Sequence, residues 1–144
     1  MQFEEIVTAV LEQAKVVAVV GLSSNPERPS YGVAKFLQER GCRIIPVNPQ
    51  IHEVLGEPAY PSLQAIPREI VVDVVDVFRR APDTPPVAAE AVAIGAKVLW
   101  LQLGIVSPEA ATIASAGGLT VIMDRCMKIE WEARWGTGSA PAQA

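Results

Sequence analysis

Short apolar runs alternate with amphipathic stretches along most of the chain. Five runs are rich in valine, isoleucine and leucine: residues 15–22, 42–47, 70–78, 97–103 and 119–123. Because these runs are mostly apolar and do not alternate regularly with polar residues, they predict strands that are buried on both faces of a parallel sheet. Pro46 has no backbone N–H, so we expect it near a strand end or where no ladder partner is needed.

The stretches between these runs have the apolar spacing of helices. Apolar residues recur at three- and four-residue steps over residues 3–14, and further helices are expected at 30–41, 84–94, 107–117 and 127–135. Ser30, Thr84 and Ser107 are the predicted N-caps. Residues 50–69 are interrupted by proline and glycine, and they predict a loop with one helical turn near 62–65.

Strands that alternate with helices through short connections predict an α/β fold of the Rossmann-like, doubly wound type. Five parallel strands with helices on both faces suggest the order 3-2-1-4-5, numbered along the chain. Residues 1–135 form a single predicted domain, and the small polar tail at 136–144 is expected to be disordered. Ligands of such sheets bind beyond the carboxyl ends of the strands, at residues 21–32, 48–50, 78–82, 102–107 and 124–128.

Composition narrows the classes of function. A net charge of -4 and a pI near 5.0 give no support for a general nucleic-acid binder. The two cysteines are far apart and form no CxxC motif, which argues against a disulfide scaffold or a structural zinc site and favours a reducing cytoplasm. No apolar run approaches the roughly 20 residues that a membrane-spanning helix needs.

The loop after the first strand is the first candidate site. Gly21 permits a tight turn, Ser23 and Ser24 offer hydroxyls and amides, and Arg28 supplies a positive charge. The N-terminus of the following helix presents free N–H groups and the positive end of its dipole, which suits a pyrophosphate. An ordinary surface loop is the alternative interpretation.

Two departures argue against NAD as the nucleotide. A GxGxxG fingerprint needs glycines at 21, 23 and 26, but the chain has Ser23 and Pro26. NAD binders usually place an acidic residue after the second strand, where this chain has Asn48 and Pro49. The sequence has no P-loop, which argues against an ATP-hydrolysing switch.

Four charged residues in and after the third strand are open to two interpretations. Asp73 and Asp76 interrupt an apolar strand, where a carboxylate is costly unless it is hydrogen-bonded. Satisfied structural carboxylates are the favoured interpretation, and chemistry is the alternative. Arg79 and Arg80 follow the strand directly, where they can hold a terminal phosphate or simply form a solvated basic turn.

Thiol and imidazole chemistry finds less support. His52 lies in a polar loop without an identifiable partner, which favours a solvated surface side chain. Cys42 begins a buried strand and is expected in the core. Cys126 follows Arg125 after the fifth strand, where a cation and a helix N-terminus favour a thiolate, but no histidine base accompanies it. Cys126 is therefore either a redox-active or a structural thiol.

Six segments, in order and at the expected spacing, resemble the small stand-alone CoA-binding proteins. The fold of that family is similar to the N-terminal CoA-binding domain of the succinyl-CoA synthetase alpha subunit. The segments are VVGLSSNPERPSYGVAKFL (19–37), IIPVNP (44–49), G-x-x-AYPSL (56–63), VDVVDVFR (72–79), IGAKVLWLQLGI (94–105) and GLTVIMDRCMKIE (118–130).

The resemblance implies a cofactor, coenzyme A, and a set of residues that contact it. The CoA diphosphate is lined by Gly21, Leu22, Ser23, Ser24, Arg28 and Tyr31. The adenosine portion meets Asn48, Pro49 and Gln50. The nucleotide and the start of the pantetheine arm are flanked by Val77, Phe78, Arg79 and Arg80. The arm itself runs beside Gln102, Leu103 and Gly104.

The resemblance carries binding and not the ligase reaction. The synthetase alpha subunit has a phosphorylatable histidine in a second domain, and His52 is not in a matching context. We therefore expect a cytoplasmic module that binds CoA or acyl-CoA, with no catalytic or metal-binding residues and no nucleic-acid or membrane partner. The alternatives are an acyl-CoA-handling enzyme subunit that needs an unidentified protein partner, a NAD-binding regulator, and a redox device in which Cys126 exchanges with the CoA thiol.

Overall fold

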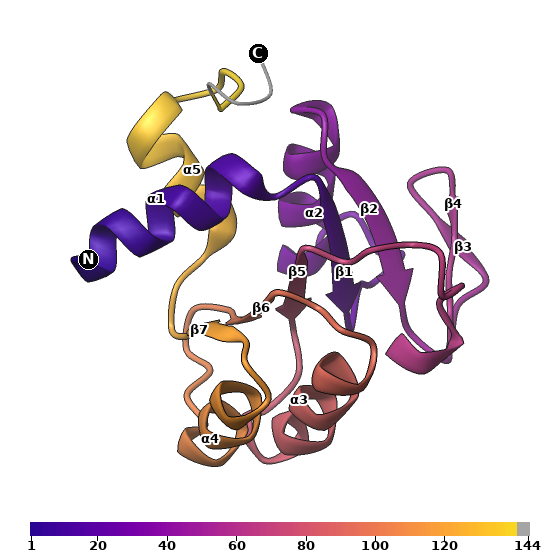
Figure 1. Cartoon of the computed structure of the whole chain (residues 1–144). Coiled ribbons are helices and arrows are strands. Elements are labelled where there is room, and N and C mark those ends of the chain that lie inside the picture. The colour runs from indigo at the N-terminus through magenta and orange to yellow at the C-terminus, as the bar shows by residue number, and fades with distance from the viewer. Residues whose placement is uncertain (141–144) are drawn as a thin grey trace.

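The computed structural model describes residues 1–140 and contains a five-stranded parallel sheet (Figure 1). Its strands are β1 (Val16–Val20), β2 (Arg43–Val47), β5 (Val74–Val77), β6 (Val98–Leu101) and β7 (Thr120–Ile122). Each strand lies within one of the five apolar runs, so the α/β class and the strand segments are confirmed. The third strand is shorter than expected, because residues 70–73 precede the ladder.

Five helices cover the two faces of the sheet (Figure 1). Helices α1 (Phe3–Gln13), α2 (Pro29–Glu39) and α5 (Met127–Trp135) pack on one face, and α3 (Thr84–Ala93) and α4 (Pro108–Ala116) pack on the other. Each face has its own hydrophobic core, with Leu11 and Trp131 in one and Ala88 and Ala114 in the other. Helices on both faces define a doubly wound sheet.

The predicted strand order is wrong in one respect. The sheet runs β2-β1-β5-β6-β7, which is 2-1-3-4-5 among the five strands and not 3-2-1-4-5. Strand β5 pairs with β1 in parallel, with Val17 opposite Val74, so β2 lies at the edge. Pro46 explains this placement, because a β2 with two neighbours would lack a ladder donor at that position.

The connection between β2 and β5 contains a hairpin that the sequence did not predict. Strands β3 (Glu53–Val54) and β4 (Glu57–Pro58) are joined by Leu55 and Gly56, whose φ angles are 55° and 76°. Two consecutive positive φ values are typical of a type I′ turn. Leucine rarely adopts a positive φ, so the sequence does not show the residue types that usually mark such a turn. The predicted helical turn is confirmed as a 3-10 helix over Leu63–Ala65.

Two of the three predicted N-caps are displaced by one or two residues. Helix α2 begins at Pro29 with Arg28 as its N-cap, so Ser30 lies inside the first turn. Helix α3 begins at Thr84 itself, with Asp83 as the N-cap. Ser107 caps α4 as predicted, since its hydroxyl accepts the N–H of Ala110 at 3.1 Å.

The predicted tail divides into two parts. Residues 136–140 contact α5: the Trp131 indole donates to the carbonyl oxygen of Gly138 at 2.8 Å, and Ala140 is buried. Residues 141–144 lie outside the described residues. Within residues 1–140, no helix combines the length and apolar character needed to cross a membrane.

Candidate functional site

The switch point of the sheet lies between β1 and β5. The chain leaves β1 toward α2 on one face and leaves β5 toward α3 on the other, so a crevice is expected between their carboxyl ends. Gly21 and Phe78 line this point: Gly21 N–H donates to the Val47 carbonyl and Phe78 N–H to the Val20 carbonyl, both at 2.8 Å. Gly21 has φ 86°, and a Cβ there would overlap the carbonyl oxygen of Phe78.

Side chains of the loop after Gly21 hold its backbone in place. The Ser30 hydroxyl accepts the N–H of Ser23, the Ser23 hydroxyl accepts that of Asn25, and the Asn25 amide oxygen accepts that of Glu27, each at 3.0 Å. Ser30 is buried, which fixes the loop against the start of α2. The loop is therefore organised by its own hydrogen bonds before any ligand arrives.

The same bonds reduce the number of free amides. Pro29 has no N–H, and the N–H groups of Tyr31 and Gly32 donate to the Arg28 carbonyl at 3.1 and 3.3 Å. Within residues 21–32, the backbone amides of Leu22, Ser24 and Ser30 have no acceptor among the described residues. The helix N-terminus thus has fewer free N–H donors for an anion than the sequence suggested. The Arg28 guanidinium group is therefore a larger share of the donors at this position.

Two cavities flank Gly21. One of about 330 Å³ is lined by Gly21, Ser23, Arg28, Pro29, Ser30 and Phe78. The other, of about 180 Å³, lies against α3 and is lined by Val20, Val47, Pro49, Pro61, Ser62, Leu63, Arg79, Val87 and Glu90. Each cavity therefore contains one arginine from the predicted site.

The arginines that follow β5 differ in their partners. Arg80 is exposed and its Nε lies 3.4 Å from Asp83 Oδ2. Arg28 and Arg79 have no carboxylate partner among the described residues. Two guanidinium groups without a carboxylate partner therefore lie on either side of the switch point.

The segment after β2 supports the loop after β1. The Asn48 amide nitrogen donates to the Leu22 carbonyl at 3.0 Å, and the Asn48 amide oxygen accepts the N–H of Gln50 at 2.9 Å. The Leu22 and Val77 side chains are fully buried, so these residues offer a ligand only their backbone. Pro49 and Gln50, which follow Asn48, are exposed. Tyr31 is half-buried and packs against the core.

The segment after β6 continues the same edge. Gln102 is buried, whereas Leu103 and Gly104 are exposed, and Gly104 N–H donates to Asp124 Oδ1 at 2.7 Å. The sixteen predicted site residues thus lie at or after the carboxyl ends of four adjacent strands, β2, β1, β5 and β6. Their contact with a ligand stays a prediction.

The two aspartates of the third run have different roles. Asp73 Oδ2 accepts the N–H groups of Lys15 and Val16 at 3.1 and 2.9 Å, and its Oδ1 lies 3.1 Å from Lys97 Nζ. Asp73 is therefore the satisfied structural carboxylate that was favoured. Asp76 is fully buried, its Oδ1 accepts from the Gln102 amide, and its Oδ2 has no partner. Burial raises the pKa of Asp76 to about 7, while the hydrogen bond from Gln102 opposes this shift.

The cation next to Cys126 points elsewhere. Arg125 Nη1 lies 2.7 Å from Glu4 Oε1 and 3.1 Å from Glu130 Oε1, so it joins α1 and α5. Cys126 is half-buried at the N-cap of α5 and packs against the core. Residues 1–140 contain no group of three His, Cys, Asp or Glu side chains that could hold a metal ion.

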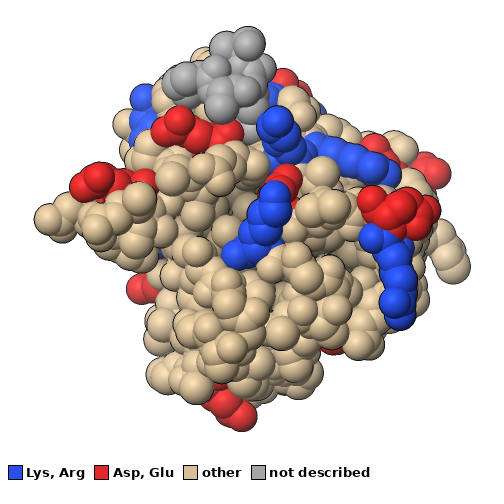
Figure 2. Space-filling model, in the orientation of Figure 1, with Lys and Arg blue, Asp and Glu red and all other residues tan. Residues whose placement is uncertain are grey.

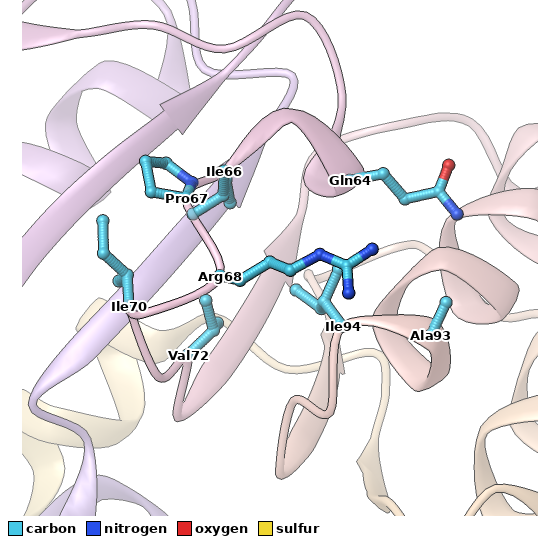
Figure 3. A pocket seen from close by; sticks show the side chains of 8 residues that line it. All are labelled: Gln64, Ile66, Pro67, Arg68, Ile70, Val72, Ala93 and Ile94. Carbon is cyan, nitrogen blue, oxygen red and sulfur yellow. The ribbon is translucent and has the colours of Figure 1, made fainter.

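A larger cavity lies at the opposite edge of the sheet. It has a volume of about 380 Å³ and is lined by Gln64, Ile66, Pro67, Arg68, Ile70, Val72, Ala93 and Ile94 (Figure 3). These residues precede β5 or end α3, so the cavity lies near the amino ends of the strands. Doubly wound sheets bind ligands at the other edge. Size alone therefore does not mark this cavity as the candidate site.

Charged side chains are unevenly distributed over the elements. The face drawn in Figure 2 carries interspersed positive and negative side chains and no continuous basic area. Helices α3 and α4 contribute few charges, since Glu90 and Glu109 are their only charged residues.

Topology places the chain among the doubly wound α/β proteins, with its candidate site at the switch point. The sequence matches the CoA binding domain family over residues 15–132, and the chain belongs to that family. The family predicted from the six segments is therefore confirmed.

Individual relatives agree with this assignment. The chain is 47% identical over 120 residues to the uncharacterized protein YneT of Bacillus subtilis, which covers 83% of this chain and 87% of that protein. The structure of a hypothetical protein from Pyrococcus horikoshii superposes with a TM-score of 0.87, at 38% identity and 92% coverage of both chains. The alpha subunit of acetate–CoA ligase (ADP-forming) II from Pyrococcus furiosus is 39% identical over 65 residues, which are 44% of this chain and 14% of that protein.

Proposed function

We propose that the protein binds coenzyme A, or an acyl-CoA, at the carboxyl edge of its sheet. The observation that carries this proposal is the cavity at the switch point lined by Gly21 and Arg28, with the free guanidinium group of Arg79 in a second cavity beside it. Backbone amides of this loop that have no acceptor, together with the two guanidinium groups, can donate hydrogen bonds to a diphosphate. Membership of the CoA binding domain family supports CoA as its carrier.

The diphosphate, the adenosine portion and the pantetheine arm of the cofactor lie on three different segments of this edge. The diphosphate lies on residues 21–31, between Arg28 and Arg79. The adenosine portion lies toward Pro49 and the cavity that Arg79 lines. The pantetheine arm extends along Gln102 to Gly104, on the next strand of the sheet. When bound, CoA supplies a thiol that carries an acyl group; the residues named here bind and orient the cofactor.

Calorimetry with four ligands tests the proposal. CoA is expected to bind at least about tenfold more tightly than NAD or ATP, because neither of these carries a pantetheine arm. The affinity for dephospho-CoA, compared with that for CoA, shows whether the protein contacts the 3′-phosphate. Arg28→Met and Arg79→Met should each weaken CoA binding about tenfold, because each removes a charged hydrogen-bond donor.

Arg68→Met is the matched control, because Arg68 is exposed at the opposite edge and also has no ion-pair partner among the described residues. It should leave affinity unchanged. A wild-type protein that binds no CoA, or that binds NAD equally well, would contradict the proposal.

A second function is favoured by one relative. The likeness to an acetate–CoA ligase alpha subunit suggests that this chain presents CoA to a catalytic partner. Affinity capture with the wild-type chain, in parallel with Arg28→Met and Arg79→Met, tests it. The expected result is a partner whose addition gives CoA-dependent acyl transfer with the wild-type chain and not with the variants.

A further inference from the structure

Asp76 occupies an unusual place for a carboxylate. It lies on the central strand β5, two residues before Phe78, and alternation along the strand directs it to the face covered by α1, α2 and α5. It is fully buried, and its Oδ2 has no hydrogen-bond partner among the described residues. A buried carboxylate with an unsatisfied oxygen destabilises the fold.

Gln102 is the single partner of this carboxylate within the described residues. It lies on the neighbouring strand's extension, one same-face step beyond Trp100, which is opposite Asp76 in the register. The Gln102 amide nitrogen donates to Asp76 Oδ1. An ionised carboxylate only accepts hydrogen bonds, so in that form Asp76 fixes the amide with its nitrogen inward and its carbonyl oxygen directed away from Asp76.

The carbonyl oxygen of Gln102 is free for a ligand. No described residue donates to Gln102 Oε1, and this oxygen is not among the solvent-excluded unsatisfied atoms. The residues that follow, Leu103 and Gly104, are exposed at the carboxyl edge. An acceptor is therefore presented next to the edge where the proposed function places the pantetheine arm.

A contact whose only role was to hold β5 and β6 together would not require the polar pair Asp76 and Gln102. Every other residue of β5 and β6 is an apolar side chain, and apolar residues of similar volume would join the strands without an unsatisfied oxygen. A polar pair kept at such a cost at a strand end is typical of a functional position.

We propose that Gln102 accepts a hydrogen bond from an amide N–H of the pantetheine arm, and that Asp76 is the positioning residue that holds the Gln102 amide in this orientation. The inference rests on the proposed function and adds how the site distinguishes a pantetheine-bearing nucleotide from a bare one. Asp76 itself does not contact the ligand.

The test compares CoA with adenosine 3′-phosphate 5′-diphosphate, which keeps the nucleotide and lacks the arm. Gln102→Met removes the acceptor and should weaken CoA binding about three- to tenfold, while binding of the armless nucleotide stays unchanged. Asp76→Asn keeps the shape but no longer fixes the amide, so it should weaken CoA binding about two- to threefold. In the Gln102→Met background, Asp76→Asn should have no further effect.

Two further variants protect the test from folding defects. The double variant Asp76→Leu/Gln102→Met replaces both polar groups, so it should fold and show the same selective loss for CoA. Gln64→Met, on an exposed residue at the opposite edge, is the control and should bind both ligands normally.

Each outcome decides the inference. Equal weakening for both ligands would assign the pair a structural role, and wild-type CoA affinity in Gln102→Met would remove the acceptor role. A wild-type protein that binds both ligands equally tightly shows that the arm is not read, which overturns the inference but leaves the nucleotide site. A wild-type protein that binds neither ligand refutes the proposed function as well.

Discussion

Gly21 is the residue at which backbone conformation and close contact coincide. Its φ of 86° favours glycine, and its missing side chain makes room for the Phe78 carbonyl. Gly21→Ala should therefore lower the free energy of unfolding by about 2–4 kcal/mol, through strain and overlap together. It should also weaken CoA binding more than tenfold, because β1 and β5 must separate to admit the methyl group. Urea denaturation and calorimetry measure the two effects.

Gly41→Ala is the matched control. Gly41 also has a positive φ, 97°, but a Cβ there would meet no atom within 4 Å. It should cost about 1 kcal/mol of stability and leave CoA affinity unchanged. If Gly21→Ala and Gly41→Ala have the same effect on CoA affinity, the close approach of Gly21 to Phe78 does not contribute to binding.

The residues that were open to two interpretations show what a sequence lacks. Asp73 and Asp76 occur in the same apolar run, but only the fold gives Asp73 two backbone donors and leaves Asp76 with one side-chain donor. Arg79 and Arg80 are adjacent, but only Arg80 has a carboxylate within reach. Residue type predicted where polar groups gather, whereas their partners come from segments far away in the chain.

Elements with a strong local signal were predicted well. The five apolar runs and the five amphipathic stretches contain all strands of the main sheet and, apart from Pro29 at the start of α2, all α-helices of residues 1–140. The order of the strands depends on pairing between distant segments, and only Pro46 gave a hint that β2 is an edge strand. The β3–β4 hairpin escaped because Leu55 occupies a turn position that glycine or asparagine normally marks.

The contact between α1 and α5 allows a prediction at the scale of elements. Arg134 donates from Nε to Thr8 Oγ1 at 2.7 Å, and its Nη1 and Nη2 lie 3.0 and 3.2 Å from Glu130 Oε1 and Glu4 Oε2. The Arg134 side chain is only 15% exposed, so these bonds are partly shielded from water. Arg134→Met keeps the apolar stem and should lower the free energy of unfolding by about 1–3 kcal/mol.

Hydrogen exchange locates the effect of this substitution. Protection should fall first in α1 and α5, while α3 and α4, on the other face of the sheet, keep theirs. Arg68→Met, at an exposed arginine without an ion-pair partner among the described residues, is the control and should change neither measurement. Uniform loss of protection over both faces would show that α1 does not form a separate unit with α5.

At the scale of the whole molecule, one edge of the sheet carries the candidate site and the sheet interior supports it. Four adjacent strands contribute loops to that edge, and the two cores on either face hold the strands in register. Asp76 connects the sheet interior to the candidate site, because it is buried within the sheet and its partner Gln102 lies at the edge that carries the site. The stability of the entire fold should therefore respond to the ionisation of this one group.

The pH dependence of unfolding tests this link. The pKa of Asp76 is about 7 in the folded protein against an ordinary value of 3.8. Below pH 3.8 the carboxyl is protonated in both states, and its burial carries no ionisation cost. Between these two pKa values the unfolded chain releases the proton and the folded chain keeps it, so stability falls as pH rises. Above pH 7 both states are ionised, and the loss is constant at roughly 4 kcal/mol.

Asp76→Asn cannot ionise, so it should escape this loss. Its free energy of unfolding relative to wild type should rise steadily between pH 4.5 and 7 and level off by pH 8, when both proteins are unfolded with urea at each pH. Contributions from the other titrating groups cancel in the difference between the two proteins. Parallel stability curves over this range would mean that Asp76 is ionised throughout in the folded protein. The unpartnered oxygen would then have to be stabilised by water that enters from the edge of the sheet.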